Sequence, residues 1–449
     1  MNICFKIVFA ALLSLVYVNV SGYTLLDGKL ESSEIYPGTV HSFNVSVPDN
    51  YDAQADAALF VGLDGIMCDA PTVFDNLIAE GVMPVTIGVY LIPGVIKDEN
   101  GEVLRYNRSN EFDATDGRFA KFLEEELIPA VKKMILPDGK SIRITDNPKM
   151  RAIYGLSSGG IAAFNAAWHR PDLFGKVFMG CATLVPMRGG HSLQAIVRKH
   201  EPKPIKIMLQ DTFHDTWNPL FGSWYEANLL MASALEFAGY DVKTDWVEGG
   251  HSPARACEIF PQVMRWLWNP VDSSRVTENN LLSPMLIKGN DWEKTDNRKV
   301  KLSFGADMRH AIYPDGTLVA SYDDEKSNFL NQSIVTSDGE KYLQRFYWLH
   351  TYDNTALQVG GMAFDGDGNL WIVTNAGIQI CDQNGRVRGI LSVPRDIDTR
   401  NIGISILPGK ESGLSNVYLI KPDGTPLYVR TFNLRYPQKG NRPVSQGQG

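Results

Sequence analysis

The sequence predicts a doubly wound α/β fold with a mostly parallel sheet, followed by a smaller all-β, propeller-like module. From about residue 23 to 270, short apolar runs alternate with amphipathic helical stretches. Nearly continuous apolar runs are typical of strands that are buried on both faces of a parallel sheet. After residue 296 the helical stripes disappear, and β-like runs follow Asp-Gly or Asn-Gly dipeptides, which suit tight hairpin turns.

The elements of the first part follow from apolar spacing. We predict strands over residues 41–47, 57–63, 84–91, 151–154, 176–180, 205–209 and 242–247. We predict helices over residues 71–80, 117–135, 158–169, 223–238 and 254–268. In the second part, strands are predicted over 317–321, 370–374 and 427–432. The alternation of strands and helices in the first part predicts βαβ units.

The chain begins with a stretch that resembles a secretory signal peptide, predicted over residues 1–22. Lys6 gives a short positive region, residues 7–20 form an apolar run, and Ser21 and Gly22 are small residues suited to cleavage. The apolar run is too short to span a membrane comfortably. We therefore expect a secreted or periplasmic protein that does not span the membrane.

The remaining boundaries follow from changes in composition. We predict an α/β domain over 23–270, a Pro-rich polar linker over 271–296, the β module over 297–437 and a disordered tail over 438–449. Hydrophobic residues make up 44% and charged residues 21%, as in folded proteins, and the net charge is −8. An acidic chain without a basic cluster argues against a nucleic-acid partner.

The cysteines give no pairing pattern. Cys68, Cys181, Cys257 and Cys381 are widely spread, without CxxC or metal-type spacing. Export would permit disulfides, but buried free thiols are the favoured interpretation.

The segment over residues 151–168 carries the clearest chemical signal. Residues 155–159 read G-x-S-x-G, between a predicted strand and a predicted helix. A serine nucleophile needs this sharp turn, whose flanking positions must be small, and the following helix directs backbone N–H groups at a developing oxyanion. The alternative is a glycine-rich turn that packs a helix on the sheet. We favour Ser157 as the nucleophile and Ser158 as an oxyanion-hole residue through its backbone N–H.

A serine nucleophile needs a base and an orienting acid, in the chain order Ser, Asp or Glu, His. His251 lies in a loop directly after the last predicted strand and is the histidine with the right order and context. Asp211 and Asp215 both follow the preceding strand. We favour Asp215, which lies further into its loop and can reach His251, whereas Asp211 directly ends the strand and suits a turn or capping role.

Further site residues are predicted from their positions. Ile66 follows the strand over 57–63 and is expected to supply the second oxyanion N–H. Arg188, His191, Trp217 and Trp224 are candidate substrate-binding residues, although loop structure or core packing would also explain them. No metal motif competes in the sequence, and no cofactor is expected.

These residues resemble a known family. The segments RAIYGLSSGG, RPDLFGKVF, PIKIMLQD and AGYDVKTDWVEGGHS are similar to the putative esterase family, which holds enterochelin esterases and bacterial feruloyl and acetylxylan esterases. The resemblance covers about residues 40 to 268. It implies an α/β-hydrolase fold, cofactor-free cleavage of carboxylic esters, and a triad of Ser157, His251 and Asp215. Asp64 stands where many members have histidine.

The second module resembles part of a gluconolactonase-like β-propeller. The matching residues are GGMAFDGDGNLWIVT (360–374) and GIQICD (377–382). The module is long enough for about three of the usual blades, and Gly360 stands where a metal-ligating aspartate is expected. We therefore predict a structural or binding appendage.

Together these observations predict a secreted serine esterase that acts on a small-molecule or polysaccharide ester, with acetyl or feruloyl esters of polysaccharide favoured. The alternatives are a siderophore esterase of the enterochelin type, a non-catalytic carbohydrate-binding protein that retains the hydrolase fold, and a lactonase that acts through the β module.

Overall fold

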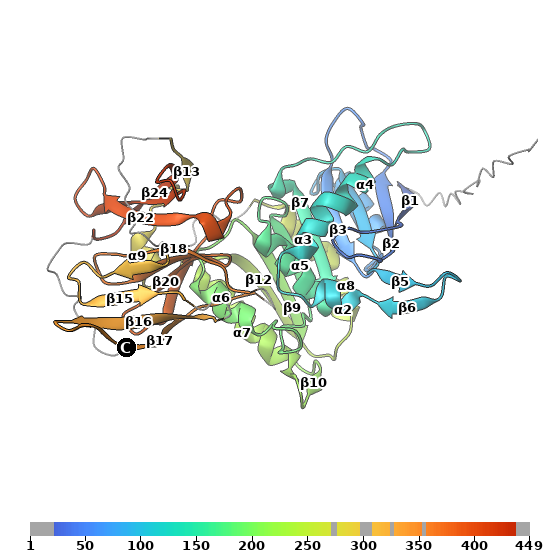
Figure 1. The fold of residues 1–449 in the computed structure, drawn as a ribbon. Coiled ribbons are helices and arrows are strands. Elements are labelled where there is room, and N and C mark those ends of the chain that lie inside the picture. The colour runs from blue at the N-terminus through green and yellow to red at the C-terminus, as the bar shows by residue number, and fades with distance from the viewer. Residues whose placement is uncertain (1–21, 271–275, 297–307, 324–326, 353–355, 437–449) are drawn as a thin grey trace, which may run out of the picture.

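An eight-stranded sheet forms the centre of the first part of the chain, in the order β1-β2-β4-β3-β7-β8-β9-β12 (Figure 1). The computed structural model describes residues 22–270, 276–296, 308–323, 327–352 and 356–436. The strands are β1 (Tyr23–Leu30), β2 (His41–Pro48), β3 (Ala58–Leu63), β4 (Thr86–Leu91), β7 (Arg151–Leu156), β8 (Lys176–Gly180), β9 (Lys206–Thr212) and β12 (Asp241–Val247). The six strands from β4 to β12 are parallel, and β1 and β2 add an antiparallel edge.

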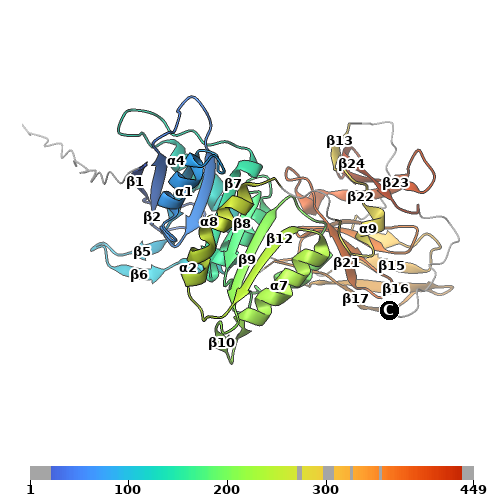
Figure 2. The ribbon, with the colours of Figure 1, turned by 180° about the vertical axis from the view of Figure 1, so that it is seen from behind.

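Helices cover both faces of this sheet (Figures 1 and 2). On one face lie α1 (Ala70–Ala79) and α8 (Ala254–Trp268), whose Phe74 and Phe260 contact Phe60 of β3. On the other face lie α5 (Ser158–His169), α6 (Ser192–Lys199) and α7 (Trp224–Ala238), which share a second apolar cluster with the sheet. All the predicted strands and helices of this part have counterparts here, whereas β1 and α6 were not predicted.

The helix predicted over 117–135 is interrupted. It consists of α3 (Arg118–Phe122), a π-helical turn η1 (Leu123–Leu127) and α4 (Ile128–Lys132). Pro129 has no backbone N–H, so the regular hydrogen-bond ladder cannot continue through it. Two small hairpins and a short helix were also not predicted. They are β5 (Val95–Lys97) with β6 (Val103–Tyr106), β10 (Trp217–Asn218) with β11 (Gly222–Ser223), and α2 (Arg108–Phe112).

The second part contains three four-stranded antiparallel sheets among the residues that the structure describes. The first holds β14 (His310–Ile312), β15 (Leu318–Ser321), β16 (Phe329–Thr336) and β17 (Gly339–Trp348). The second holds β18 (Val359–Phe364), β19 (Leu370–Thr374), β20 (Gly377–Cys381) and β21 (Val387–Leu391). The third holds β22 (Gly403–Pro408), β23 (Leu414–Ile420), β24 (Pro426–Asn433) and β13 (Glu293–Lys294). An all-β module is therefore present, while its propeller character stays a prediction.

The Asp-Gly and Asn-Gly dipeptides of this module turn the chain as their composition predicts. Their glycines all have positive φ, between 75° and 101°, a region that costs glycine little. These glycines are Gly316, Gly339, Gly368, Gly385 and Gly424.

The stretch predicted as a linker is partly structured. Its described residues, 276–296, include α9 (Leu282–Met285) and β13. Leu282 is fully buried and Met285 is 3% exposed, and both pack in the apolar core of the β module with Trp371. The leucine and methionine side chains therefore tie this stretch to the module. The predicted signal peptide, except Gly22, and the predicted tail lie outside the described residues.

The two parts share one continuous apolar core. Leu349 and Val359 of the second part are buried in the same cluster as Trp168 of α5. Trp168 Nε1 donates a hydrogen bond of 3.0 Å to the Tyr352 hydroxyl, and the β module lies beside α6 (Figure 1). Within the described ranges, no helix combines the length and apolar character needed to cross a membrane.

Candidate active site

Ser157 lies at the sharp turn between β7 and α5. Its φ and ψ are 57° and −120°, a strained combination for a residue other than glycine. A Cβ added to Gly155 would lie 2.2 Å from the carbonyl oxygen of Gly159. The missing side chain of Gly155 therefore lets the end of β7 and the first turn of α5 approach each other on either side of Ser157.

A chain of hydrogen bonds runs from Ser157 to His251 and Asp215. Ser157 Oγ lies 3.0 Å from His251 Nε2, and His251 Nδ1 lies 2.5 Å from Asp215 Oδ1. His251 follows β12 and Asp215 follows β9, so neighbouring parallel strands deliver both side chains to one edge of the sheet. With Nδ1–H donating to Asp215, Nε2 is the acceptor that the Ser157 hydroxyl proton requires.

The two aspartates of the acid loop have opposite ionisation behaviour. Burial raises the pKa of Asp215, but hydrogen bonds from His251, Asp211 and the Thr216 N–H outweigh burial and hold this pKa below its ordinary value. Burial, followed by the hydrogen bond to Asp215 and its negative charge, raises the pKa of Asp211 to about 9. The surroundings therefore favour the ionised form of Asp215 and the neutral form of Asp211.

Two residues that the sequence did not single out, Thr183 and Cys181, also surround the serine. Thr183 Oγ1 lies 3.2 Å from Ser157 Oγ and accepts a hydrogen bond of 3.3 Å from Trp224 Nε1. Cys181 is a buried free thiol with positive φ at the end of β8. Neither residue belongs to a recognisable motif, so only the fold reveals their positions.

Trp224 is a correction. We predicted it as a substrate-binding residue, but only 5% of its surface is exposed, and its ring packs edge-on against His251 with 6.5 Å between ring centroids. It begins α7 and packs in the core, because a large aromatic ring next to the sheet gains more from burial than from exposure. Its role here is to support Thr183 and His251.

The other predicted substrate residues lie outside the hydrogen-bond chain. Trp217 is 71% exposed on the β10–β11 hairpin. Arg188 is half-buried and donates to the Ser109 carbonyl over 3.2 Å. His191 is exposed and precedes the first residue of α6. A role for these three in substrate binding stays a prediction.

The predicted oxyanion donors lie at two loop–element junctions. Ser158 is the first residue of α5, where backbone N–H groups have no acceptor within the helix. Ile66 is 40% exposed in the loop after β3. Asp64 and Gly65, directly before it, both have positive φ, and Asp64 accepts two hydrogen bonds of 2.7 and 2.8 Å from Arg108. This bidentate pair fixes the start of the loop.

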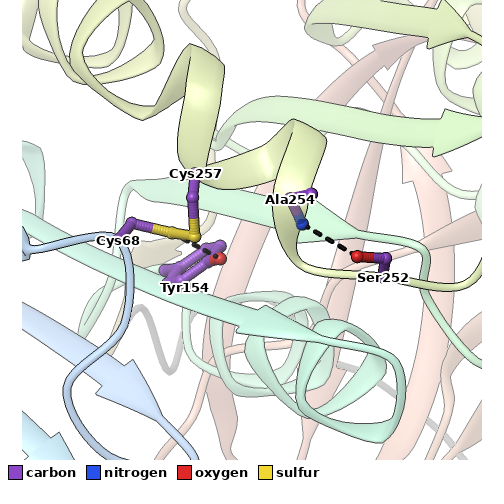
Figure 3. Close-up of a disulfide and its surroundings, with 5 residues drawn as sticks. All are labelled: Cys68, Tyr154, Ser252, Ala254 and Cys257. Carbon is purple, nitrogen blue, oxygen red and sulfur yellow. Dashed lines mark hydrogen bonds between the residues drawn. A yellow bond between two sulfur atoms is a disulfide. The ribbon is translucent and has the colours of Figure 1, made fainter. Parts of the chain in front are cut away.

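A disulfide ties this loop to the helix that follows His251. Cys68 bonds to Cys257 of α8 across a sequence separation of 189 residues, beside the Tyr154 ring (Figure 3). The prediction of free thiols is therefore wrong for this pair, because the fold brings together cysteines that no local pattern relates. It is confirmed for Cys181 and Cys381. The disulfide links the Ile66 loop to the helix beyond the His251 loop.

We expect the double variant Cys68→Ser/Cys257→Ser to lose about 2–4 kcal/mol of unfolding free energy, because the long loop then gains freedom in the unfolded state. Urea unfolding with and without reductant measures this. Reductant should lower the stability of the wild-type protein to that of the variant and leave the variant unchanged. A wild-type stability insensitive to reductant would contradict the prediction.

One group of side chains in the described chain has metal-ligating atoms in mutual reach. It consists of Cys181, Asp215 and His251, whose ligand atoms lie within 4.8 Å of one another. His251 and Asp215 are already hydrogen-bonded to each other there. Burial raises the pKa of the Cys181 thiol to about 12, which disfavours the thiolate that binds metal. The group fits a triad better than a metal site.

The doubly wound sheet with a serine on its strand–helix turn defines an α/β hydrolase. The model of the family described as "Putative esterase" matches residues 35–277, which is more than half of the chain, and the chain belongs to this family. It is accordingly a carboxylic ester hydrolase. No curated protein matches the chain.

Several solved structures are similar over the same part. A ferulic acid esterase shares 16% identity at a TM-score of 0.41 over 55% of this chain and 97% of its own. A ferulic acid esterase from the anaerobic fungus Anaeromyces mucronatus shares 19% identity at a TM-score of 0.39, over 55% of this chain and 91% of its own. The enterobactin esterase of Shigella flexneri shares 21% at a TM-score of 0.41, over 54% of this chain. The chain spans only 59% of that enterobactin esterase.

Proposed function

We propose that this hydrolase is an exported serine esterase that works through Ser157, His251 and Asp215. The observation that carries the proposal is the unbroken chain of hydrogen bonds from Asp215 through His251 to a serine on a strained turn. Such a constellation activates a hydroxyl that is otherwise a weak nucleophile.

The reaction proceeds in two acyl transfers. Ser157 Oγ attacks the ester carbonyl while its proton passes to His251 Nε2, and the oxyanion accepts hydrogen bonds from the backbone N–H groups of Ser158 and Ile66. The C–O bond then breaks, and His251 gives its proton to the leaving alcohol. Water attacks the acyl-enzyme with His251 again as base, which releases the acid and restores Ser157.

We favour acetyl or feruloyl esters of polysaccharide as substrates. The His251 side chain is 34% exposed, and Trp217 presents an exposed ring on a nearby loop of the same acid segment. An open site suits an ester on a long chain, and aromatic rings suit stacking on sugars or ferulate. A siderophore esterase would need several available cations, but Arg108 is already paired twice with Asp64.

A lactonase in the β module has less support. A Cβ at Gly360 would lie 2.2 Å from the Thr399 carbonyl oxygen, so a metal-ligating aspartate has no room there. The buried Asp365 accepts hydrogen bonds from Asp367, Asn369 and Trp371, which assign it to a turn. We propose that the module is a structural or binding appendage.

Export to the cell exterior or periplasm is part of the proposal. It is supported by the composition of residues 1–22 and by the Cys68–Cys257 disulfide, because disulfides persist mainly in oxidising compartments.

A fluorophosphonate probe tests the assignment, because it reacts with an activated serine. We expect stoichiometric labelling at Ser157, located by peptide mass spectrometry, and no labelling of His251→Ala. Hydrolysis of acetylated xylan, methyl ferulate, enterochelin and gluconolactone then identifies the ester. An unlabelled wild-type protein would point to a non-catalytic carbohydrate-binding protein. Metal-dependent lactone hydrolysis that survives Ser157→Ala would instead favour a lactonase that acts through the β module.

A further inference from the structure

Two carboxyl groups meet behind the proposed catalytic histidine. Asp211, in β9, is 0% exposed, and Asp215, in the following loop, is 8% exposed. Each carboxyl shifts the pKa of the other, upward for Asp211 and downward for Asp215, as groups in close contact do. Two ionised carboxylates in a buried contact repel each other strongly, so one of them must hold a proton.

The surroundings decide which carboxyl holds the proton. Asp215 Oδ1 faces His251 Nδ1 and the Thr216 backbone N–H, and these donors favour its ionised form. In the described chain, the groups that face Asp211 besides Asp215 are neutral. They are the Thr212 N–H at 2.7 Å, the Asn228 amide at 2.9 Å and the Cys181 thiol. Asp211 is therefore the carboxyl that keeps the proton.

One oxygen of Asp215 is available to accept a hydrogen bond from the Asp211 proton. Oδ1 receives the hydrogen bonds from His251 and Thr216, whereas Oδ2 is buried and receives none from any N–H, thiol or hydroxyl group of the described residues. A buried carboxylate oxygen without a donor is costly. A carboxylic acid O–H on Asp211 supplies the missing donor.

We propose that Asp211 is a positioning residue of the triad: it stays a neutral carboxylic acid and donates its O–H to Oδ2 of Asp215. This contact holds the Asp215 carboxylate in one orientation, with Oδ1 toward His251 Nδ1. His251 is then held with Nε2 toward Ser157. The inference rests on the proposed function, because it requires that Asp215 orients the catalytic base.

Two substitutions test whether Asp211 acts as a neutral hydrogen-bond donor or as a negative charge. Asp211→Asn keeps a neutral donor, so we expect kcat within about threefold of wild type. The acid limb of the pH profile, meaning the pH at which kcat/KM falls on the acidic side, should not move. Asp211→Leu fills a similar volume without a donor, so kcat should fall at least about tenfold. If Asp211 were ionised instead, the asparagine would remove a negative charge near His251. The acid limb would then move about one unit or more to lower pH, which would overturn the proposal.

Thermal unfolding provides a readout that does not depend on turnover or on the leucine variant. Wild-type Asp211 keeps its proton on folding, whereas the unfolded chain loses it above its ordinary pKa, so the wild type loses stability as pH rises from 4 toward 9. The Tm difference between Asp211→Asn and wild type should therefore grow in favour of the variant from pH 4 to pH 8. A constant difference would overturn the neutral state.

The matched control is Asp365→Asn, which changes a fully buried carboxyl of the β module and should move neither kcat nor the acid limb. Fluorophosphonate labelling of Ser157 is recorded for every protein. An unlabelled wild type would defeat the proposed function as a whole. A labelled wild type together with a fully active, folded Asp211→Leu variant would defeat only the role of Asp211.

Discussion

Replacing Ser157 with alanine should lower kcat/KM for a simple aryl ester by about 10³-fold or more, which corresponds to about 4 kcal/mol of transition-state stabilisation. The variant keeps the oxyanion donors and the fold but has no atom that can form the acyl-enzyme. Residual hydrolysis then depends on water attacking from a poorly aligned position. Steady-state rates with an aryl acetate, measured on protein shown to be folded by circular dichroism, give the result.

The control is Ser233→Ala, an exposed serine on α7 that contacts Arg198 and should retain wild-type rates. If Ser157→Ala kept more than about a tenth of the wild-type activity, the serine would not be the nucleophile, since loss of a triad nucleophile normally costs far more. Contaminating esterase is excluded when the residual rate does not change with successive purification steps.

The sequence was most informative where one local rule determines a position. Gly155 must lack a side chain, and a Cβ at Gly159 would lie only 3.2 Å from Asp64 Oδ2, so the turn at Ser157 is visible as a spacing pattern. Strands such as β7 and β8 are buried on both faces, so they appear as continuous apolar runs. His251 follows from chain order in this fold.

The sequence was least informative where distant segments meet. Cys68 and Cys257 lie 189 residues apart, and no spacing rule pairs them. The orientation of Trp224 depends on Thr183 and His251, which lie in the segments that follow β8 and β12. The Asp211–Asp215 contact depends on how one loop folds back, and a D-x-x-x-D pattern alone does not say which carboxyl faces the histidine.

A buried ion pair lies where the β module contacts the hydrolase part. Arg430 Nη1 of β24 lies 2.9 Å from Glu201 Oε2, and the two side chains are 8% and 11% exposed. Glu201 Oε1 accepts the Ser392 backbone N–H at 2.7 Å, and the Glu201 N–H donates to the Ile390 carbonyl. The module is thus fixed to the segment between α6 and β9.

We expect Arg430→Met to cost about 3–5 kcal/mol of unfolding free energy, because it leaves the Glu201 carboxylate buried without its partner. Arg435→Met removes an exposed partner of Asp367, with 78% and 47% of the two side chains exposed, and should cost less than about 1 kcal/mol. Urea unfolding of both variants measures the difference.

The double variant Glu201→Gln/Arg430→Met should recover much of the loss, since it removes the unpaired carboxylate charge of Glu201. If the double variant is no more stable than Arg430→Met, the loss comes from packing of the arginine and not from the unpaired carboxylate. If recovery is observed, the contact between the two parts depends on charge pairing, and a hydrolase part without its module would expose both this acid and the shared apolar core around Trp168.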